Sequence, residues 1–237
     1  MSEVQAEGLY PYTTNAGKSF AEDREEFDVR GGVFSVVTCG DQVIYIPVWT
    51  QAGEGGEEQN CAGYIFRRIF SEAGVEWLFP GKVWINDLWA VENLIRSSHD
   101  IVNLEGTNPR LTLSGGVHLY TYEQLSDFGN QLMIGDRLVM YLVTHLEPSK
   151  LVFVAHFAEF IGHDEEGNAI LLNDDAELIE GPIDLKDMYR THGGLTQSMG
   201  DPYPTVMAAV YRPKPDMRLA LEVEALPPIG VRERPVG

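Results

Sequence analysis

The chain has 237 residues, of which 44% are hydrophobic, and 36 acidic side chains outnumber 17 basic ones to give a net charge of −19. This length allows one domain with a core that needs no disulfides. So acidic a surface repels phosphate groups, so we expect neither nucleic-acid binding nor attachment to anionic membranes. With no apolar run near 18 residues and no secretory signal, we expect no membrane insertion and a cytoplasmic location before assembly.

Two further features of the composition bear on the environment of the protein. Lysine is scarce among the basic residues, and an acidic, lysine-poor surface stays dissolved where salt screens self-repulsion. A salt-loving source is therefore one hypothesis, and a merely acidic protein is the alternative. Cys39 and Cys61 are too few for a disulfide scaffold. Two buried free thiols are favoured over a bridge or a metal pair.

The sequence divides into three parts. Residues 1–32 are polar, contain several glycines and lack helical or strand periodicity, so we expect an extended N-terminal arm. Residues 33–226 are predicted to form a β-rich core domain. Residues 227–237 carry prolines and are predicted to be a C-terminal arm.

The first half of the core alternates strands and helices. Residues 33–38 and 42–48 are predicted to pair as a hairpin, because Gly-Asp between them is a turn signal. Residues 60–74 predict a short helix capped by Asn60. Residues 75–84 are predicted to be strand-like, with a break at Pro-Gly.

Two more helices flank a second hairpin. Residues 86–98 predict a helix capped by Asn86, with one apolar stripe. Residues 101–120 alternate loosely around Ser-Gly-Gly and predict a hairpin. Residues 121–129 predict a helix that opens with a capping box, Thr121 to Gln124.

Residues 131–173 are the most informative stretch. Three apolar segments, 137–143, 151–161 and 169–172, are separated by turn residues, which is typical of consecutive antiparallel strands. Strands that are apolar on both faces must be covered on both sides, so we expect this meander to lie in the core.

The chain then continues with a helix over 184–192, which we expect to end before Gly193-Gly194, and with strands over 206–211 and 217–224. The predicted fold class is α+β, mainly antiparallel β with a barrel- or sandwich-like core, about four short peripheral helices and extended terminal arms.

Candidate residues for catalysis and metal binding lie around the second strand of the meander. Glu159 stands among aromatic residues, where burial would raise its pKa; the alternative is that its side chain points to solvent. His156 and His163 are on the same segment. Two acidic clusters contain the carboxylates that bind hard cations, but their spacing does not bring the two clusters together. The favoured interpretation is that these acidic side chains lie in turns and face water. Their members are Asp164, Glu165, Glu166, Asp174 and Asp175. We expect no cofactor, with a divalent cation such as Ca2+ left open.

Trp77, Trp84 and Trp89 offer a third kind of site. Clustered tryptophans can bind a sugar or a peptide, although aromatic packing within the core is the more frequent arrangement. A carbohydrate- or peptide-binding module is therefore one alternative function.

No motif specifies a chemistry, so the function rests on general features. We favour a non-enzymatic structural protein that acts through protein–protein contacts, as a homo-oligomer or an accessory component of a viral particle (capsid, neck or tail). Extended arms can order on neighbouring subunits. The expected interface anchors are Leu9, Tyr10, Tyr12, Phe20, Ile229 and Val231. The enzymatic alternative is a carboxylate- or metal-dependent hydrolase that uses the residues around Glu159.

Overall fold

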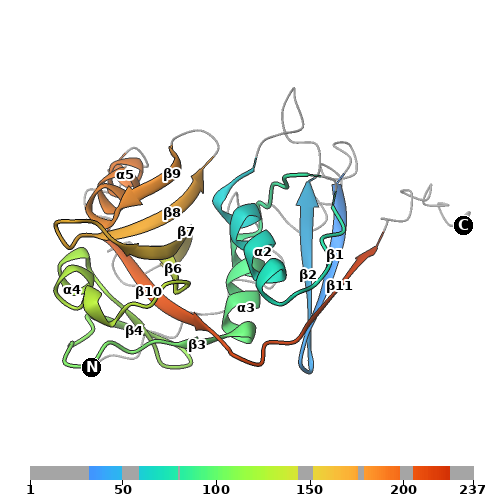
Figure 1. The fold of residues 1–237 in the computed structure, drawn as a ribbon, viewed down its shortest axis with the longest axis horizontal. Coiled ribbons are helices and arrows are strands. Elements are labelled where there is room, and N and C mark those ends of the chain that lie inside the picture. Colours follow the sequence, from blue (N-terminus) through green and yellow to red (C-terminus); the bar gives the residue numbers. More distant parts are fainter. Residues whose placement is uncertain are drawn as a thin grey trace, which may run out of the picture.

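The computed structural model describes residues 32–49, 59–79, 81–143, 152–175, 179–197 and 205–224. These residues form mostly antiparallel strands with some helices, which confirms the predicted α+β class with a β-rich core (Figure 1). Two of the helices, α2 and α3, belong to the core and are not peripheral as predicted. The strands are β1 (Gly32–Cys39), β2 (Gln42–Trp49), β3 (His99–Ile101), β4 (Leu111–Leu113), β5 (Val117–Leu119), β6 (Arg137–Val143), β7 (Val152–His163), β8 (Ala169–Asp175), β9 (Ile179–Asp184), β10 (Thr205–Pro213) and β11 (Leu219–Glu224). The α-helices are α2 (Cys61–Glu72), α3 (Leu88–Ser98), α4 (Tyr122–Asp127) and α5 (Leu185–Gln197), and Gly129–Gln131 forms a 3-10 turn.

The described strands form three antiparallel sheets. A three-stranded sheet has the order β11-β1-β2, a six-stranded sheet has the order β3-β10-β6-β7-β8-β9, and β4 and β5 form a small hairpin. The predicted meander is confirmed as β6-β7-β8 in the middle of the larger sheet. The last two strands are divided between the large sheets, since β10 pairs with β6 and β11 pairs with β1.

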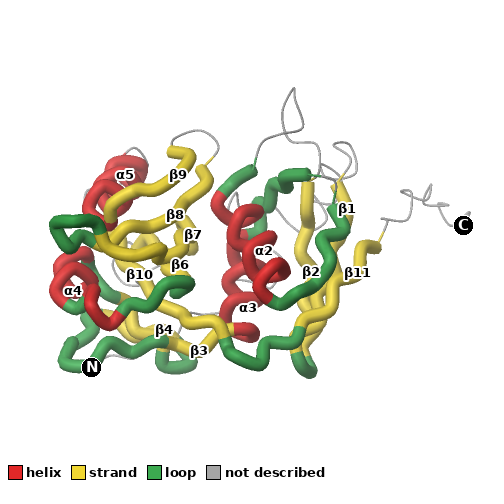
Figure 2. Tube along the Cα trace, in the orientation of Figure 1, coloured by secondary structure: helices red, strands yellow, loops and turns green. Residues whose placement is uncertain are grey.

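Helices α2 and α3 lie between the two large sheets, and α4 and α5 lie on the far side of the six-stranded sheet (Figure 2). We call the apolar cluster around α2 and α3 the inter-sheet core; it includes Val37, Phe66, Leu94 and Val139. A second cluster, the outer core, packs the other face of the six-stranded sheet against α4 and α5. The six-stranded sheet is thus covered on both faces.

Strand β6 shows why the sequence gives this arrangement. Successive strand side chains point to opposite faces, so Val139 and Tyr141 enter the inter-sheet core, whereas Leu138 and Met140 enter the outer core. An apolar residue is therefore required at nearly every position, as predicted for a strand covered on both sides.

The helices begin at side-chain caps. The Asn60 Oδ1 atom accepts a hydrogen bond from the Gly63 N–H at 3.0 Å, as predicted. The capping box of Thr121 and Gln124 is also present. The cap of α3 was predicted one residue early: Asp87 accepts from the Ala90 N–H at 3.0 Å, while Asn86 accepts from the indole N–H of Trp84.

Two local predictions were wrong, and one strand was not predicted. Over 75–79 and 81–84 the structure has no named strand, because Trp77 and Phe79 pack sideways against α2. Helix α5 continues past Gly193 and Gly194 to Gln197. Strand β9 was not expected, because its Gly181-Pro182 pair reads as a turn; at the edge of a sheet a proline is tolerated.

No described helix combines the length and the apolar character that a membrane-spanning segment requires.

Candidate functional site

Glu159, the principal catalytic candidate, lies in a network of charged side chains between β7 and α2. Its carboxylate accepts two hydrogen bonds from Arg68, at 2.8 and 2.9 Å, and one from the Tyr64 hydroxyl at 3.3 Å. Arg137 of the neighbouring strand approaches it with its Nη1 atom at 3.1 Å and also contacts Glu72. Arg137 is 0% exposed and Glu159 is 3% exposed, so this ion-pair network belongs to the interior.

The network fixes Glu159 in its ionised form. Burial opposes ionisation, but the hydrogen bonds from Arg68 and the charges of Arg137 and Arg68 outweigh it, so the pKa of Glu159 is lowered. The prediction of a raised pKa was therefore wrong. Phe157 shares the face of β7 with Glu159, whereas Phe160 packs in the outer core, and the charged partners of Glu159 come from α2 and β6. A carboxylate held by two guanidinium groups is a poor proton donor.

His156 lies on the opposite face of the same strand. It pairs with Met140 of β6, whose side chain enters the outer core. The His156 ring stacks on that of His192 in α5, with centroids 4.1 Å apart. Burial and then the charge of His192 lower the pKa of His156, and burial lowers that of His192 to about 4. Glu159 and His156 face different cores across one strand, so they do not meet at one reacting atom.

His163 and the first acidic cluster lie at the end of the hairpin between β7 and β8. The His163 ring is exposed and packs edge-on against Phe160, with centroids 5.1 Å apart. Asp164 accepts hydrogen bonds from the backbone N–H groups of Glu166 and Asn168, at 3.0 and 2.8 Å, and from the Asn168 amide. Asp164 therefore organises its own turn.

The other metal candidates do not join this turn. Glu165 and Glu166 are exposed. The side chains of Asp174 and Asp175 lie outside the described part of the chain, although their backbone belongs to β8. Among the described residues, no group of three or more His, Cys, Asp or Glu side chains is placed to hold a metal ion. Cys39 and Cys61 are both buried and unbridged, as favoured from the sequence.

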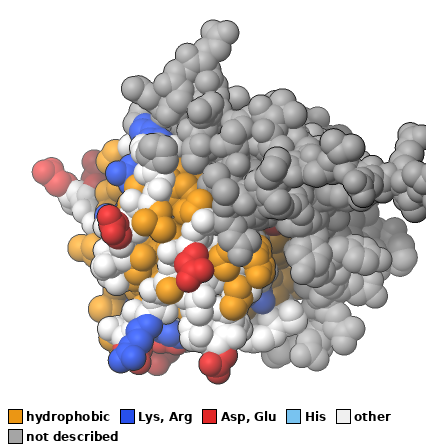
Figure 3. Space-filling model, turned by 90° about the vertical axis from the view of Figure 1, so that its right-hand side faces the viewer, with side chains coloured by type: hydrophobic (Ala, Val, Ile, Leu, Met, Phe, Trp, Pro, Cys, Tyr) orange, Lys and Arg blue, Asp and Glu red, His pale blue; other side chains and the backbone are white. Residues whose placement is uncertain are grey.

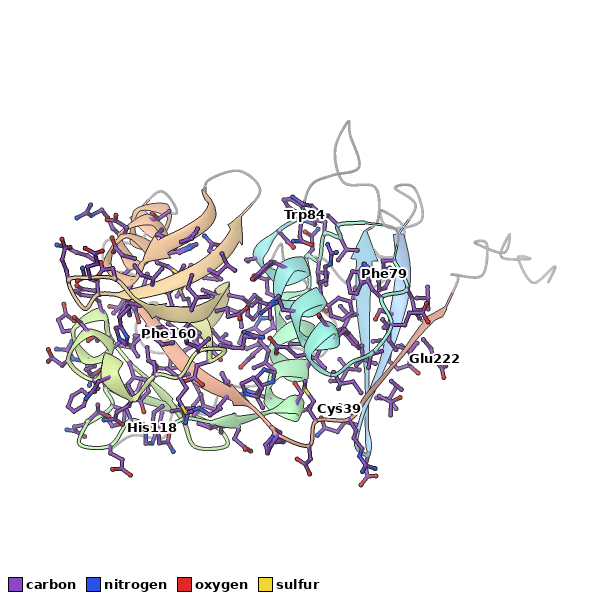
Figure 4. All side chains as sticks on the ribbon, viewed as in Figure 1. Cys39, Phe79, Trp84, His118, Phe160 and Glu222 are labelled. Carbon is purple, nitrogen blue, oxygen red and sulfur yellow. The ribbon has the colours of Figure 1, made fainter. Side chains whose placement is uncertain are left out.

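The three tryptophans serve largely as packing groups. Trp77 contacts Phe66 edge-on and Phe79 at a tilt, and it donates its indole N–H to the Gly81 carbonyl. The guanidinium group of Arg67 lies over its ring. Phe79 and Trp84 both lie near the end of the three-stranded sheet (Figure 4). Trp89 packs against the inter-sheet core. Since all three are only partly exposed, the interpretation as packing groups is the stronger one.

Comparison with protein-family models, with curated proteins and with solved structures gives no match. The site must therefore be argued from the chain alone. The predicted interface anchors Leu9, Tyr10, Tyr12, Phe20, Ile229 and Val231 lie outside the described residues.

The structure also shows an apolar turn that the sequence analysis missed. Met133 and Ile134 are 56% and 76% exposed, the two highest values among the large hydrophobic side chains described. They open a turn closed by a hydrogen bond from the Asp136 N–H to the Met133 carbonyl at 2.8 Å. Gly135 has a φ of +94°, which the third position of a type II turn requires. We call Met133 and Ile134 the apolar tip.

The apolar tip is rigidly supported. Asp136 is fully buried and accepts two hydrogen bonds from Arg212, both at 2.8 Å, and a third from the Met133 N–H at 2.8 Å. The backbone of Gly135 and Asp136 is also hydrogen-bonded to Phe160 of β7. A bidentate carboxylate–guanidinium pair resists rotation. The backbone that carries the two exposed apolar side chains is therefore held in one position.

Proposed function

We propose that this protein is a structural component that acts through protein–protein contacts, including contacts between copies of itself. The observation that supports this most is the apolar tip, because turns ordinarily present polar residues to water. Met133 and Ile134 instead present apolar surface from a braced turn. Burying each of them in a partner would contribute about 1.5–3 kcal/mol. A few residues carry most of the free energy of many interfaces, and a preorganised surface loses less conformational entropy on binding.

An accessory component of a viral particle, in the capsid, neck or tail, is the role we propose for it. The arms expected over 1–32 and 227–237 support this proposal by analogy, since extended segments allow one subunit to bind several neighbours. The hydrolase alternative is weaker, because Glu159 and His156 face opposite sides of the sheet and Glu159 is committed to two arginines. The binding-module alternative is weaker because Trp77 and Trp89 pack against other aromatic and core groups.

The test is the absolute mass in solution, by light scattering behind a sizing column, at low and at molar salt. We expect a multiple of 26.4 kDa for the wild-type chain. The variant Met133→Ser/Ile134→Ser should shift the mass toward the monomer while its unfolding midpoint stays unchanged. Leu78→Ser, which alters another exposed apolar residue, is the matched control. A wild-type monomer at every concentration and salt would refute self-association.

A further inference from the structure

The open edge of β2 differs from the other sheet edges described. Strand β2 forms one edge of the three-stranded sheet and contains no charged residue, in a chain of which 22% is charged. Natural edge strands are normally protected by charge, proline or shortness. The edges at β11, β9 and β3 follow that rule, because β11 carries glutamates, β9 contains Pro182 and β3 has three residues. In β2 the only such protection is Pro47, which does not extend to residues 42–46.

The backbone of β2 has hydrogen-bonding groups directed away from β1. The β1–β2 hairpin turns through two residues, Gly40 and Asp41, with a φ of +58° only at the glycine, as in a type II′ turn. In such a hairpin Cys39 and Gln42 are a hydrogen-bonded pair, and bonded pairs alternate along the ladder. The N–H and C=O groups of Val43 and Tyr45 therefore point to the open edge.

The side chains of the same two residues are exposed. Val43 is 53% exposed and Tyr45 is 49% exposed, on the face of the sheet turned away from α3. Figure 3 shows hydrophobic side chains gathered on the described part of this side of the molecule. An exposed β-branched residue and an exposed aromatic residue flank Ile44, whose side chain packs toward the inter-sheet core.

We propose that β2 pairs antiparallel with β2 of a second copy of the chain, with the two Ile44 residues opposite each other on a two-fold axis. This proposal rests on the proposed function and adds to the apolar tip a second surface of self-association. In this register Val43 of each copy lies opposite Tyr45 of the other copy. Each of these two pairs exchanges two backbone hydrogen bonds, so the interface contains four. Aromatic and β-branched residues directly opposite each other are a favourable cross-strand combination. The interface is self-complementary, because both copies contribute the same residues, as a two-fold axis requires.

Pro47 limits the extent of this pairing. It lies opposite Phe34 at a position whose backbone faces the open edge, and it has no N–H to donate. The shared ladder is therefore confined to the segment around Val43 and Tyr45. A register shifted toward Pro47 loses backbone hydrogen bonds, because proline has no N–H. A register shifted toward Gln42 places the turn of the hairpin within the paired segment.

The charge of the chain favours the same surface. With a net charge of −19, two copies repel each other unless they meet where no acidic residue is concentrated. Glu222 of β11 is separated from Tyr45 by β1, since both lie opposite Val36. Figure 4 places Glu222 on the far strand of that sheet. Across the proposed six-stranded assembly the two β11 strands are about 24 Å apart, well beyond the screening length of roughly 8 Å at physiological salt.

The test uses full-length variants measured by sedimentation velocity over a concentration series. Val43→Asp/Tyr45→Asp places like charges opposite each other in both pairs and should weaken the dimer at least about tenfold. Val43→Lys/Tyr45→Asp places opposite charges in both pairs and should restore it. Thr38→Asp, on the exposed face of the central strand β1, is the matched control and should leave the dimer intact.

Each outcome separates the two proposals. Loss and recovery of the dimer as described supports the β2 register. Self-association that is unaffected by the β2 variants but reduced by Met133→Ser/Ile134→Ser overturns the β2 proposal and leaves the proposed function standing. A wild-type monomer at all concentrations overturns both. Circular dichroism and urea unfolding of each variant exclude loss of folding as the cause. Val43→Pro removes an outward N–H and the valine side chain without removing a hydrogen bond to β1, and it provides a second disruption.

Discussion

Replacing Glu159 by leucine should destabilise the fold far more than replacing its exposed partner. Glu159→Leu leaves Arg137 fully buried with only Glu72 as a counter-charge. Removing one partner of a buried ion pair costs about 3–5 kcal/mol. Arg68→Met removes a guanidinium whose side chain is 41% exposed, so its loss should cost only about 1 kcal/mol.

The double variant Arg137→Met/Glu159→Leu isolates the pair. It removes both buried charges and leaves Arg68 and Glu72, which already contact each other at 3.5 Å on the surface of α2. We expect its stability to lie within about 1–2 kcal/mol of the wild type, well above that of Glu159→Leu alone. Urea unfolding at pH 7 measures all four proteins. A loss below about 1.5 kcal/mol for Glu159→Leu, or a double variant that is no more stable than Glu159→Leu alone, would refute the account of the network.

The same comparison has a defined pH dependence. The folded-state pKa of Glu159 is lowered, so the unfolded chain binds the proton more readily. Its contribution to stability is fully present above the unfolded pKa of about 4.3 and is lost as the pH falls through the folded value. The difference in the free energy of unfolding between wild type and Glu159→Leu should therefore become smaller as the pH is lowered from 5 to 3. A difference that stays constant would contradict the ion pairing.

Further predictions concern other parts of the fold. Burial lowers the pKa of His192 from 6.5 to about 4, so the unfolded chain binds a proton on this group more readily than the folded one. The stability of the fold should therefore decrease as the pH falls from 6.5 toward 4. The melting temperature of His192→Gln should decrease less than that of the wild type over this interval. Gly63→Ala should destabilise by about 1–3 kcal/mol, since the new Cβ would lie 2.0 Å from the Val83 carbonyl oxygen, although alanine usually stabilises a helix; a more stable variant would show that the contact yields. If the acidic surface is an adaptation to salt, the urea midpoint should rise markedly at molar salt, whereas an unchanged midpoint would favour a merely acidic protein. Removing residues 1–30 should abolish assembly and leave the core folded, and a truncated chain that still assembles would count against a role for the arm.

Much of the fold could be predicted because local signals agree with the tertiary structure. The continuous apolar segment of β6, the cap at Asn60 and the capping box at Thr121 each report on their own neighbourhood, and each was found. Strand β9 was missed because Gly181 and Pro182 resemble a turn, and only the position at a sheet edge explains why they are tolerated.

The candidate site could not be predicted to the same degree, because it depends on residues far apart in the sequence. Arg68 and Glu72 have the spacing of an ordinary surface pair on a helix, and nothing local indicates that Glu159 and Arg137 approach them. The apolar tip could have been noticed, since Met133 and Ile134 precede Gly135-Asp136 in a turn, but its rigidity depends on the distant Arg212.

The pairing of β11 with β1 has a consequence for how the protein is made. Phe34 lies opposite Glu224, so the first and last described strands are neighbours and almost all of the described chain lies between them. Contacts so distant in sequence form slowly, and a chain emerging from the ribosome cannot make them until Glu224 has been synthesised. The β1–β2 hairpin must therefore wait with one edge unpaired, whereas the consecutive strands β6, β7, β8 and β9 can already pair with one another. We expect a partly folded intermediate in which this meander has formed and the three-stranded sheet has not, and we expect nascent chains to depend most on chaperones at that stage.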